Sequence, residues 1–172
     1  MITCLKVSLG IMQRNARERC LRITTLLCVA SMLGGISVAA VKNMAVVISR
    51  GSKLSDVPLA DLAKLCKGMQ KSWPDGKSFL LVIKNPEAPE MRVAVQKLFG
   101  DAGGDVKAAI AKLNELRLIV KIVGSDEELL HIVETTPGAV GIIDVYSINS
   151  SVKVLRVDGK LPFDAGYTLK GN

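Results

Sequence analysis

Beyond residue 40, apolar and polar positions are arranged in blocks that predict strands and helices in turn. Short continuous apolar or β-branched runs are typical of strands buried on both faces of a sheet. Apolar residues spaced three or four apart indicate helices that bury one face. The predicted strands are 45–48, 79–83, 118–123, 139–143 and 152–157, and the predicted helices are 58–67, 89–99, 105–116 and 125–135. This alternation predicts an α/β fold, a single three-layer lobe with a mostly parallel sheet.

Local signals support three of these helices. Ser55 or Asp56 can cap the first helix, and Pro89 falls in the first turn of the second, where its missing N–H costs nothing. The fourth opens with a capping box, in which Ser125 is followed three residues later by Glu128.

Residues 1–40 have a different pattern. Four arginines between positions 14 and 22 precede an uncharged, mostly apolar stretch that ends in Val38-Ala39-Ala40. A basic segment, an apolar segment and small residues before a cleavage point make up a secretory signal peptide. We therefore predict a signal peptide over 1–40 and a single domain over 41–172, located in the periplasm. The alternative is an uncleaved membrane anchor, because an apolar run of about 18 residues is near the lower limit for a span.

Removing this leader changes the charge of the chain. Five of the 23 basic residues and one of the 16 acidic residues lie within 1–40, which leaves 18 and 15 and lowers the net charge from +7 to +3. The long basic region makes Met12 an alternative start. Nucleic-acid binding is not predicted, because that function requires a clustered basic patch. Cys66 is the only cysteine left, so we expect a buried free thiol and no intrachain disulfide.

Residues that could carry catalysis or bind a metal are few. The single histidine, His131, has no second histidine or paired cysteine to complete a metal site, and no triad motif surrounds it. We expect it to lie on the surface of its helix or to be partly packed. The acidic residues at 126–128 fall in the first turn of a helix, where they favour the helix dipole. We therefore predict no enzymatic activity, no cofactor and no metal.

Three segments occur in an order that points to a known fold. The first runs from the strand at 45–48 through the helix and Gly68 to a turn, Trp73-Pro74-Asp75-Gly76, before the next strand. The others are 124–142, with Thr136-Pro137-Gly138 leading into a strand, and 152–159. Together they resemble the phosphate-type substrate-binding proteins of ABC importers, over about residues 45–166. The resemblance implies one lobe of the type II periplasmic-binding-protein fold, with Trp73 packing or capping a loop rather than contacting ligand.

The loop that binds ligand in that family differs here. In the family, a Ser-Gly-Thr-Arg loop opens the helix after the second strand and holds an oxyanion at the helix N-terminus. The matching positions read Pro89-Glu90-Met91-Arg92, which retain the arginine, lose both hydroxyls and add a negative charge. We therefore predict weak or altered binding of a small anion. The predicted ligand-binding residues are Ser49, Arg50 and Ser52, at the end of the first strand, together with Lys84 and Arg92.

Two functions are consistent with these observations. The first is an exported, non-enzymatic binding protein of one lobe that binds a small anion such as phosphate weakly or with altered specificity. The second is a ligand-free interaction or sensor-accessory module that exposes the surface facing the other lobe in two-lobed proteins. Its partner would be a membrane transporter, a sensor protein or a second copy of the chain in a homodimer.

Overall fold

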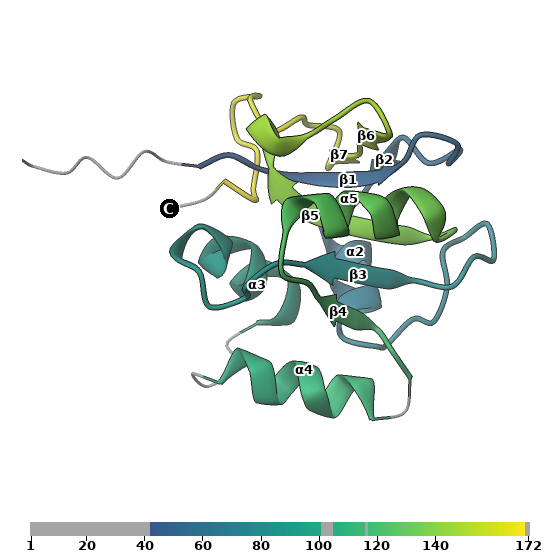
Figure 1. Cartoon of the computed structure of the whole chain (residues 1–172), viewed down its shortest axis with the longest axis vertical. Coiled ribbons are helices and arrows are strands. Elements are labelled where there is room, and N and C mark those ends of the chain that lie inside the picture. The colour runs from purple at the N-terminus through teal and green to yellow at the C-terminus, as the bar shows by residue number, and fades with distance from the viewer. Residues whose placement is uncertain (1–41, 101–104, 116, 171–172) are drawn as a thin grey trace, which may run out of the picture. The chain divides into compact units, whose positions relative to one another are not determined.

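A five-stranded sheet forms the middle layer of the molecule (Figure 1). The computed structural model describes residues 42–100, 105–115 and 117–170, so the predicted leader at 1–40 lies outside the described residues. In the order β4-β3-β5-β1-β6, the strands are β4 (Val120–Ile122), β3 (Leu80–Ile83), β5 (Ala139–Asp144), β1 (Met44–Ser49) and β6 (Val152–Val154).

Strand β1 runs against the other four strands. β3 pairs in parallel with β4 and β5, whereas β1 pairs antiparallel with β5 and β6. Four of the five strands therefore share one direction, and the prediction of a mostly parallel sheet is confirmed. The three middle strands, β3, β5 and β1, are buried almost throughout, which explains their continuous apolar sequences.

Helices on both faces complete the three predicted layers. They are α2 (Leu59–Cys66), α3 (Arg92–Phe99), α4 (Val106–Asn114) and α5 (Asp126–Thr135), with single 3₁₀ turns η1 (Pro89–Met91) and η2 (Val145–Ser147). Helix α5 packs on one face of the sheet, and α2, α3 and α4 contribute to the core on the other face. Figure 1 shows α5 in front of the sheet and α2 behind it.

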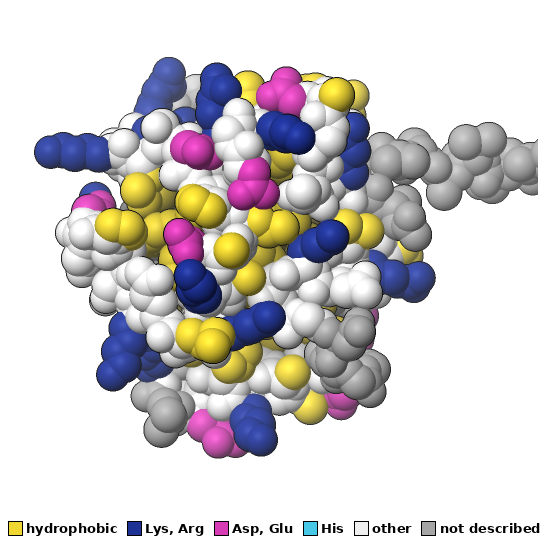
Figure 2. All heavy atoms as spheres, turned by 180° about the vertical axis from the view of Figure 1, so that it is seen from behind, with side chains coloured by type: hydrophobic (Ala, Val, Ile, Leu, Met, Phe, Trp, Pro, Cys, Tyr) yellow, Lys and Arg dark blue, Asp and Glu magenta, His cyan; other side chains and the backbone are white. Residues whose placement is uncertain are grey.

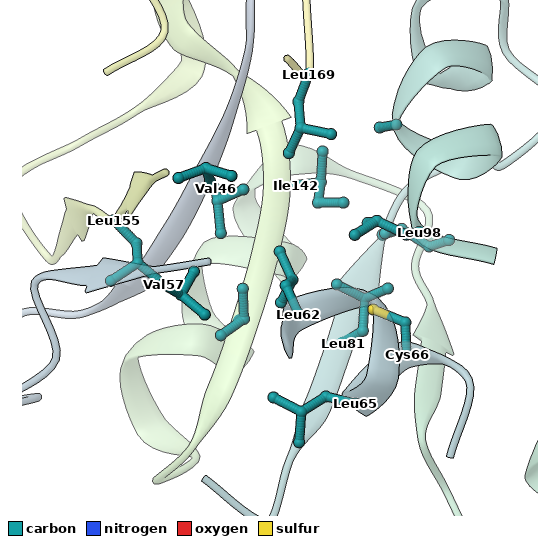
Figure 3. Packing of buried hydrophobic residues seen from close by; sticks show 14 of the residues in the cluster. Val46, Val57, Leu62, Leu65, Cys66, Leu81, Leu98, Ile142, Leu155 and Leu169 are labelled. Atoms are coloured by element: carbon teal, nitrogen blue, oxygen red, sulfur yellow. The ribbon is translucent and has the colours of Figure 1, made fainter. Parts of the chain in front are cut away.

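Alternate residues of the strands supply the two cores. On the α2 side, Val46, Leu81 and Ile142 meet Leu62 and Leu98, all of them buried (Figure 3). The neighbouring strand residues point to the opposite face and join the core beneath α5. A strand whose successive side chains enter two different cores has to be apolar at every position.

Helix α5 lies very close to the sheet at Gly141. A Cβ added to this glycine would lie 2.5 Å from Cδ2 of Leu129 and 3.1 Å from Cγ2 of Val133, both on α5. The third near atom, 3.1 Å away, is Cγ2 of Val47 on β1. The absence of a side chain at 141 therefore sets the distance between α5 and β5, which in turn positions the first turn of α5.

Trp73 fixes the long loop between α2 and β3. Its Nε1 donates a hydrogen bond of 2.9 Å to the carbonyl oxygen of Gly138, and its ring packs edge-on against Phe79 at 5.5 Å between centroids. Gly138 has φ of +86°, and a side chain there would overlap the carbonyl oxygen of Ser78. The expectation that Trp73 packs within a loop is confirmed.

Two local predictions are wrong. The strand expected at 152–157 is two strands, because β6 ends at Val154 and β7 (Arg156–Val157) pairs with β2 (Asp56–Val57) in a separate parallel ribbon. The cap of α2 is also different. Pro58 is its N-cap residue, and the N–H of Leu59 donates to Oδ1 of Asp158, which is far away in the sequence.

Candidate functional site

A hollow of about 260 Å³ opens at the carboxyl ends of β3 and β5. We call it the strand-end hollow. Its lining comes from the start of β1, the ends of β3 and β5, η1, η2 and the first residue of α5: Lys42, Met44, Lys84, Asn85, Ala88, Glu90, Met91, Asp126, Ile142, Ile143, Asp144 and Ser147. In mainly parallel sheets, ligands bind in this position, beyond the carboxyl ends of strands and beside helix N-termini.

Local features position two of the charged side chains of the hollow, those of Lys84 and Asp126. Lys84 directly follows β3, and the parallel register of Ile83 with Ile142 sets it beside the end of β5. Ser125 caps α5 by accepting a hydrogen bond from the N–H of Glu128, which makes Asp126 the first helical residue. The capping box is therefore confirmed, although the carboxylate of Glu128 accepts from the N–H of Gly124.

Asp126 is the most highly connected group in the hollow. Its Oδ1 lies 2.7 Å from Nζ of Lys84, and its Oδ2 accepts a hydrogen bond of 2.8 Å from Oγ of Ser147. Burial alone would raise the pKa of Asp126, but the hydrogen bonds from Lys84 and Ser147 and the charge of Lys84 hold it below its ordinary value. Asp126 is thus a carboxylate at neutral pH and neutralises Lys84.

A second ion pair links two residues that line the hollow. Nζ of Lys42, just before β1, lies 3.3 Å from Oε1 of Glu90 in η1. A hydrogen bond from its own backbone N–H lowers the pKa of Glu90; partial burial opposes this, and Lys42 and Lys84 add to the lowering. The side chains of Lys42 and Glu90 are 51% and 28% exposed, so solvent screens this pair.

The charges of the hollow are mixed rather than basic. Two lysines, Lys42 and Lys84, are matched by three carboxylates, on Glu90, Asp126 and Asp144. A strongly charged anion would be repelled by these carboxylates as well as attracted by the lysines. A small monoanion could instead replace one carboxylate as the partner of a lysine. No group of three or more potential metal ligands occurs among the described residues.

The structure separates the predicted site residues. Lys84 lines the strand-end hollow, but Arg92 is exposed on α3 and is not part of the lining. Ser49 is the last residue of β1, and Arg50 and Ser52 follow it. Because β1 is antiparallel to β5, this end of β1 lies beside the start of β5. These three residues therefore do not share a site with Lys84.

The residues at that opposite end have structural partners of their own. Arg50 donates to the carbonyl oxygen of Ser150 at 2.7 Å, and Nζ of Lys153 donates to the carbonyl oxygen of Ser52 at 2.6 Å. Oγ of Ser52 accepts from the N–H of Leu54. These contacts hold the turn after β1 against the segment that leads into β6.

Among the residues that line the hollow, Lys84 is the one that the sequence predicts to bind ligand; its charged and hydroxyl-bearing neighbours Lys42, Asp126, Asp144 and Ser147 are not predicted. Asp126 had been assigned only to the helix dipole. Its position at the start of a helix that follows a buried strand was a signal for a site, because strand ends and helix starts meet at one edge of such sheets. Lys42 could be placed only once the direction of β1 was known.

Comparisons with other proteins establish the fold. No protein-family model matches the sequence, and no curated protein sequence matches it. The structure is similar to an ABC-type phosphate transport receptor from Vibrio cholerae, with 15% identity, a TM-score of 0.51, and coverage of 70% of this chain and 48% of that chain. It is also similar to PstS from Borrelia burgdorferi, with 18% identity, a TM-score of 0.55, and coverage of 76% and 55%.

These similarities confirm, at the level of fold, the resemblance to phosphate ABC transporter substrate-binding proteins. The chain spans about half the length of the structures it matches. Within residues 42–100, 105–115 and 117–170, no helix is both long enough and apolar enough to cross a membrane.

Proposed function

We propose that this chain is a non-enzymatic, substrate-binding-protein-like module that acts in the periplasm and binds a small monoanion weakly, with a specificity different from that of phosphate binding. The fold supports the first part of this proposal. The predicted signal peptide at 1–40 supports the location. The ligand class follows from the strand-end hollow.

The observation that carries the proposal is the pairing of Lys84 with Asp126 at the carboxyl ends of the strands. An anion that binds Lys84 has to share it with this carboxylate or displace it. Two unit charges about 4 Å apart near a protein surface interact by roughly 4 kcal/mol before salt screening. Glu90 and Asp144 add further repulsion. A doubly charged phosphate is therefore disfavoured relative to a small carboxylate.

Removing the competing charge tests this directly. Asp126→Asn keeps an acceptor for Ser147 but frees Lys84, so we expect small-anion affinity to rise about tenfold, which corresponds to about 1.4 kcal/mol. Calorimetric titration with acetate, sulfate and phosphate measures the change. Asp61→Asn is the matched control, because it breaks an exposed ion pair with Lys64 on α2, outside the hollow.

Two further results decide the proposal. Lys84→Gln should abolish the heat seen with acetate in the unchanged chain and in the Asp126→Asn variant. The proposal of anion binding at this hollow is wrong if both the unchanged chain and the Asp126→Asn variant give no heat and no thermal shift with any of the three anions at millimolar concentration.

A second function is a ligand-free interaction module. Tyr146, beside Ser147 of the hollow, is 84% exposed, and the chain has about half the length of its structural neighbours. An exposed tyrosine next to paired charges is suited to a protein interface. Its partner would be a transporter, a sensor or a second copy of this chain.

Light scattering at increasing concentrations tests this second function. A dimer that Tyr146→Ser converts to a monomer would support it, with Phe163→Ser, another exposed aromatic residue, as the control. A constant monomer mass together with no partner after crosslinking would argue against it.

A further inference from the structure

A second, larger hollow lies in the layer formed by α2 and α4. It has a volume of about 630 Å³. We call it the basic-rimmed hollow. Its floor is formed by small or apolar residues: Gly68, Phe99, Ala109, Leu113 and Ile119. Its rim is basic and consists of Lys67, Lys71, Lys112 and Arg117. Figure 2, which views the molecule from behind, shows apolar side chains exposed among basic and acidic ones on this face.

The turn after α2 keeps the floor of this hollow open. Gly68 has φ of +72° and ends the helix, with its N–H donating to the carbonyl oxygen of Leu65. A Cβ at this position would lie 3.1 Å from Cδ1 of Ile119 and 3.9 Å from Cδ2 of Leu113. Any larger side chain would therefore occupy space on the floor, and the small Ala109 on α4 likewise leaves it free.

The rim carries only one sign of charge. Its four basic side chains have no Asp or Glu beside them among the lining residues. Arg117 is held in place because its guanidinium donates to the carbonyl oxygens of Lys71 and Gln70, at 2.8 and 3.1 Å. Lys67, Lys71 and Lys112 form no ion pair with any residue that the structure describes. Their charges are therefore available to a ligand.

We propose that the basic-rimmed hollow binds a small amphipathic carboxylate, with its apolar chain on the floor and its carboxylate at the lysine rim. Small-molecule sites are concave, mostly apolar and about 300–1,000 Å³ in volume, with a few polar groups that fix orientation. The hollow has these properties, and its charge selects an anionic head group. This proposal concerns a different site from the strand-end hollow and does not depend on the function proposed there.

Decanoate, below its micellar concentration, is a suitable probe. Calorimetric titration of the full-length chain should show saturable binding of decanoate, at least tenfold weaker binding of decanol, and no binding of phosphate at this hollow. Ala109→Trp should abolish decanoate binding by filling the floor. The double change Lys67→Gln with Lys112→Gln should weaken decanoate about tenfold and leave decanol unchanged.

Lys107→Gln is the matched control for the lysine changes. Lys107 is also on α4, but it pairs with Glu87 at 2.7 Å and does not line the hollow, so decanoate affinity should stay the same. The lysine double variant leaves the apolar floor intact and keeps the test valid if Ala109→Trp fails to fold.

Three outcomes would overturn the proposal. The first is the absence of decanoate binding. The second is decanoate affinity that is indifferent to both the Ala109 and the lysine changes. The third is cosedimentation of the chain with anionic phospholipid vesicles, lost in the lysine double variant, without any binding of free decanoate. That result would assign the basic rim to a membrane surface.

Discussion

The two hollows differ in how their charges are balanced. In the strand-end hollow, Lys84 and Lys42 each have a carboxylate partner, and the pocket is smaller, with polar and apolar residues in its lining. In the basic-rimmed hollow, three lysines have no ion-pair partner among the described residues and surround a larger apolar floor. The two hollows therefore differ chiefly in the charge that the described residues leave unpaired, and the two proposed ligand classes rest on this difference.

The largest expected effect comes from a substitution that displaces α5, which carries part of the strand-end hollow but none of the basic-rimmed hollow. Gly141→Val would force α5 away from the sheet, because an added Cβ already lies 2.5 Å from Leu129. We expect a loss of about 3 kcal/mol in the free energy of unfolding, as for overpacked cores, measured by urea denaturation. Since α5 carries Asp126, anion binding at the strand ends should change as well.

Decanoate binding to the remaining folded protein should be preserved in this variant, because α2 and α4 pack on the other face of the sheet. Gly51→Ala is the control, since an added Cβ there meets nothing within 4 Å. An equal loss of affinity for the anion at the strand ends and for decanoate would show that displacing α5 disturbs both hollows.

A smaller effect is expected from the loop that carries part of the basic rim. Trp73→Phe removes the hydrogen bond to Gly138 and leaves that buried carbonyl without its partner. We expect a loss of about 1–2 kcal/mol in the free energy of unfolding. Lys71 lies two residues earlier in the same loop, so decanoate should bind more weakly, while anion binding at the strand ends stays unchanged. Met69→Ala, at an exposed position of this loop, should alter neither.

The smallest expected effect is a loss of stability at low pH that arises from the carboxylates of the strand-end hollow. The pKa values of Asp126 and Glu90 are lowered by folding, so the unfolded chain takes up these protons first. Their contribution is fully present above their ordinary values and is lost as the pH falls below about 4. Screening limits the loss to about 1 kcal/mol or less.

Urea midpoints at pH 7 and pH 3 measure this contribution. The Asp126→Asn variant should lose less stability between these two pH values than the unchanged chain does. An identical loss in both proteins would show that the Lys84 pair does not contribute.

Features set by neighbouring residues could be predicted from the sequence. The capping box at Ser125, the helix-ending Gly68 and the buried position of Cys66 all follow from a few adjacent positions, and the structure contains each of them. Burial also raises the pKa of the Cys66 thiol, in keeping with an unreactive core residue. His131 is exposed on its helix, as expected.

Features that depend on distant pairing could not be predicted. A continuous apolar run identifies β1 as a buried strand but does not give its direction. Because β1 is antiparallel, its beginning, with Lys42, reaches the strand-end hollow, and its end, with Ser49 and Arg50, does not. The cap that Asp158 provides for α2 depends on distant pairing in the same way, since the separate ribbon of β2 and β7 brings the two segments together.

The position of β1 also affects how the molecule can form. This strand comes first in the described chain, yet its two sheet neighbours are β5 and β6, and Met44 pairs with Asp144, about a hundred residues later. Pairings of such long range slow folding, because closing the long intervening loop costs conformational entropy before the strand contacts can offset it. During synthesis, β1 has no partner strand until residues 139–144, which form β5, have been made. The sheet is therefore completed only after residues that lie about a hundred positions beyond β1 have been made.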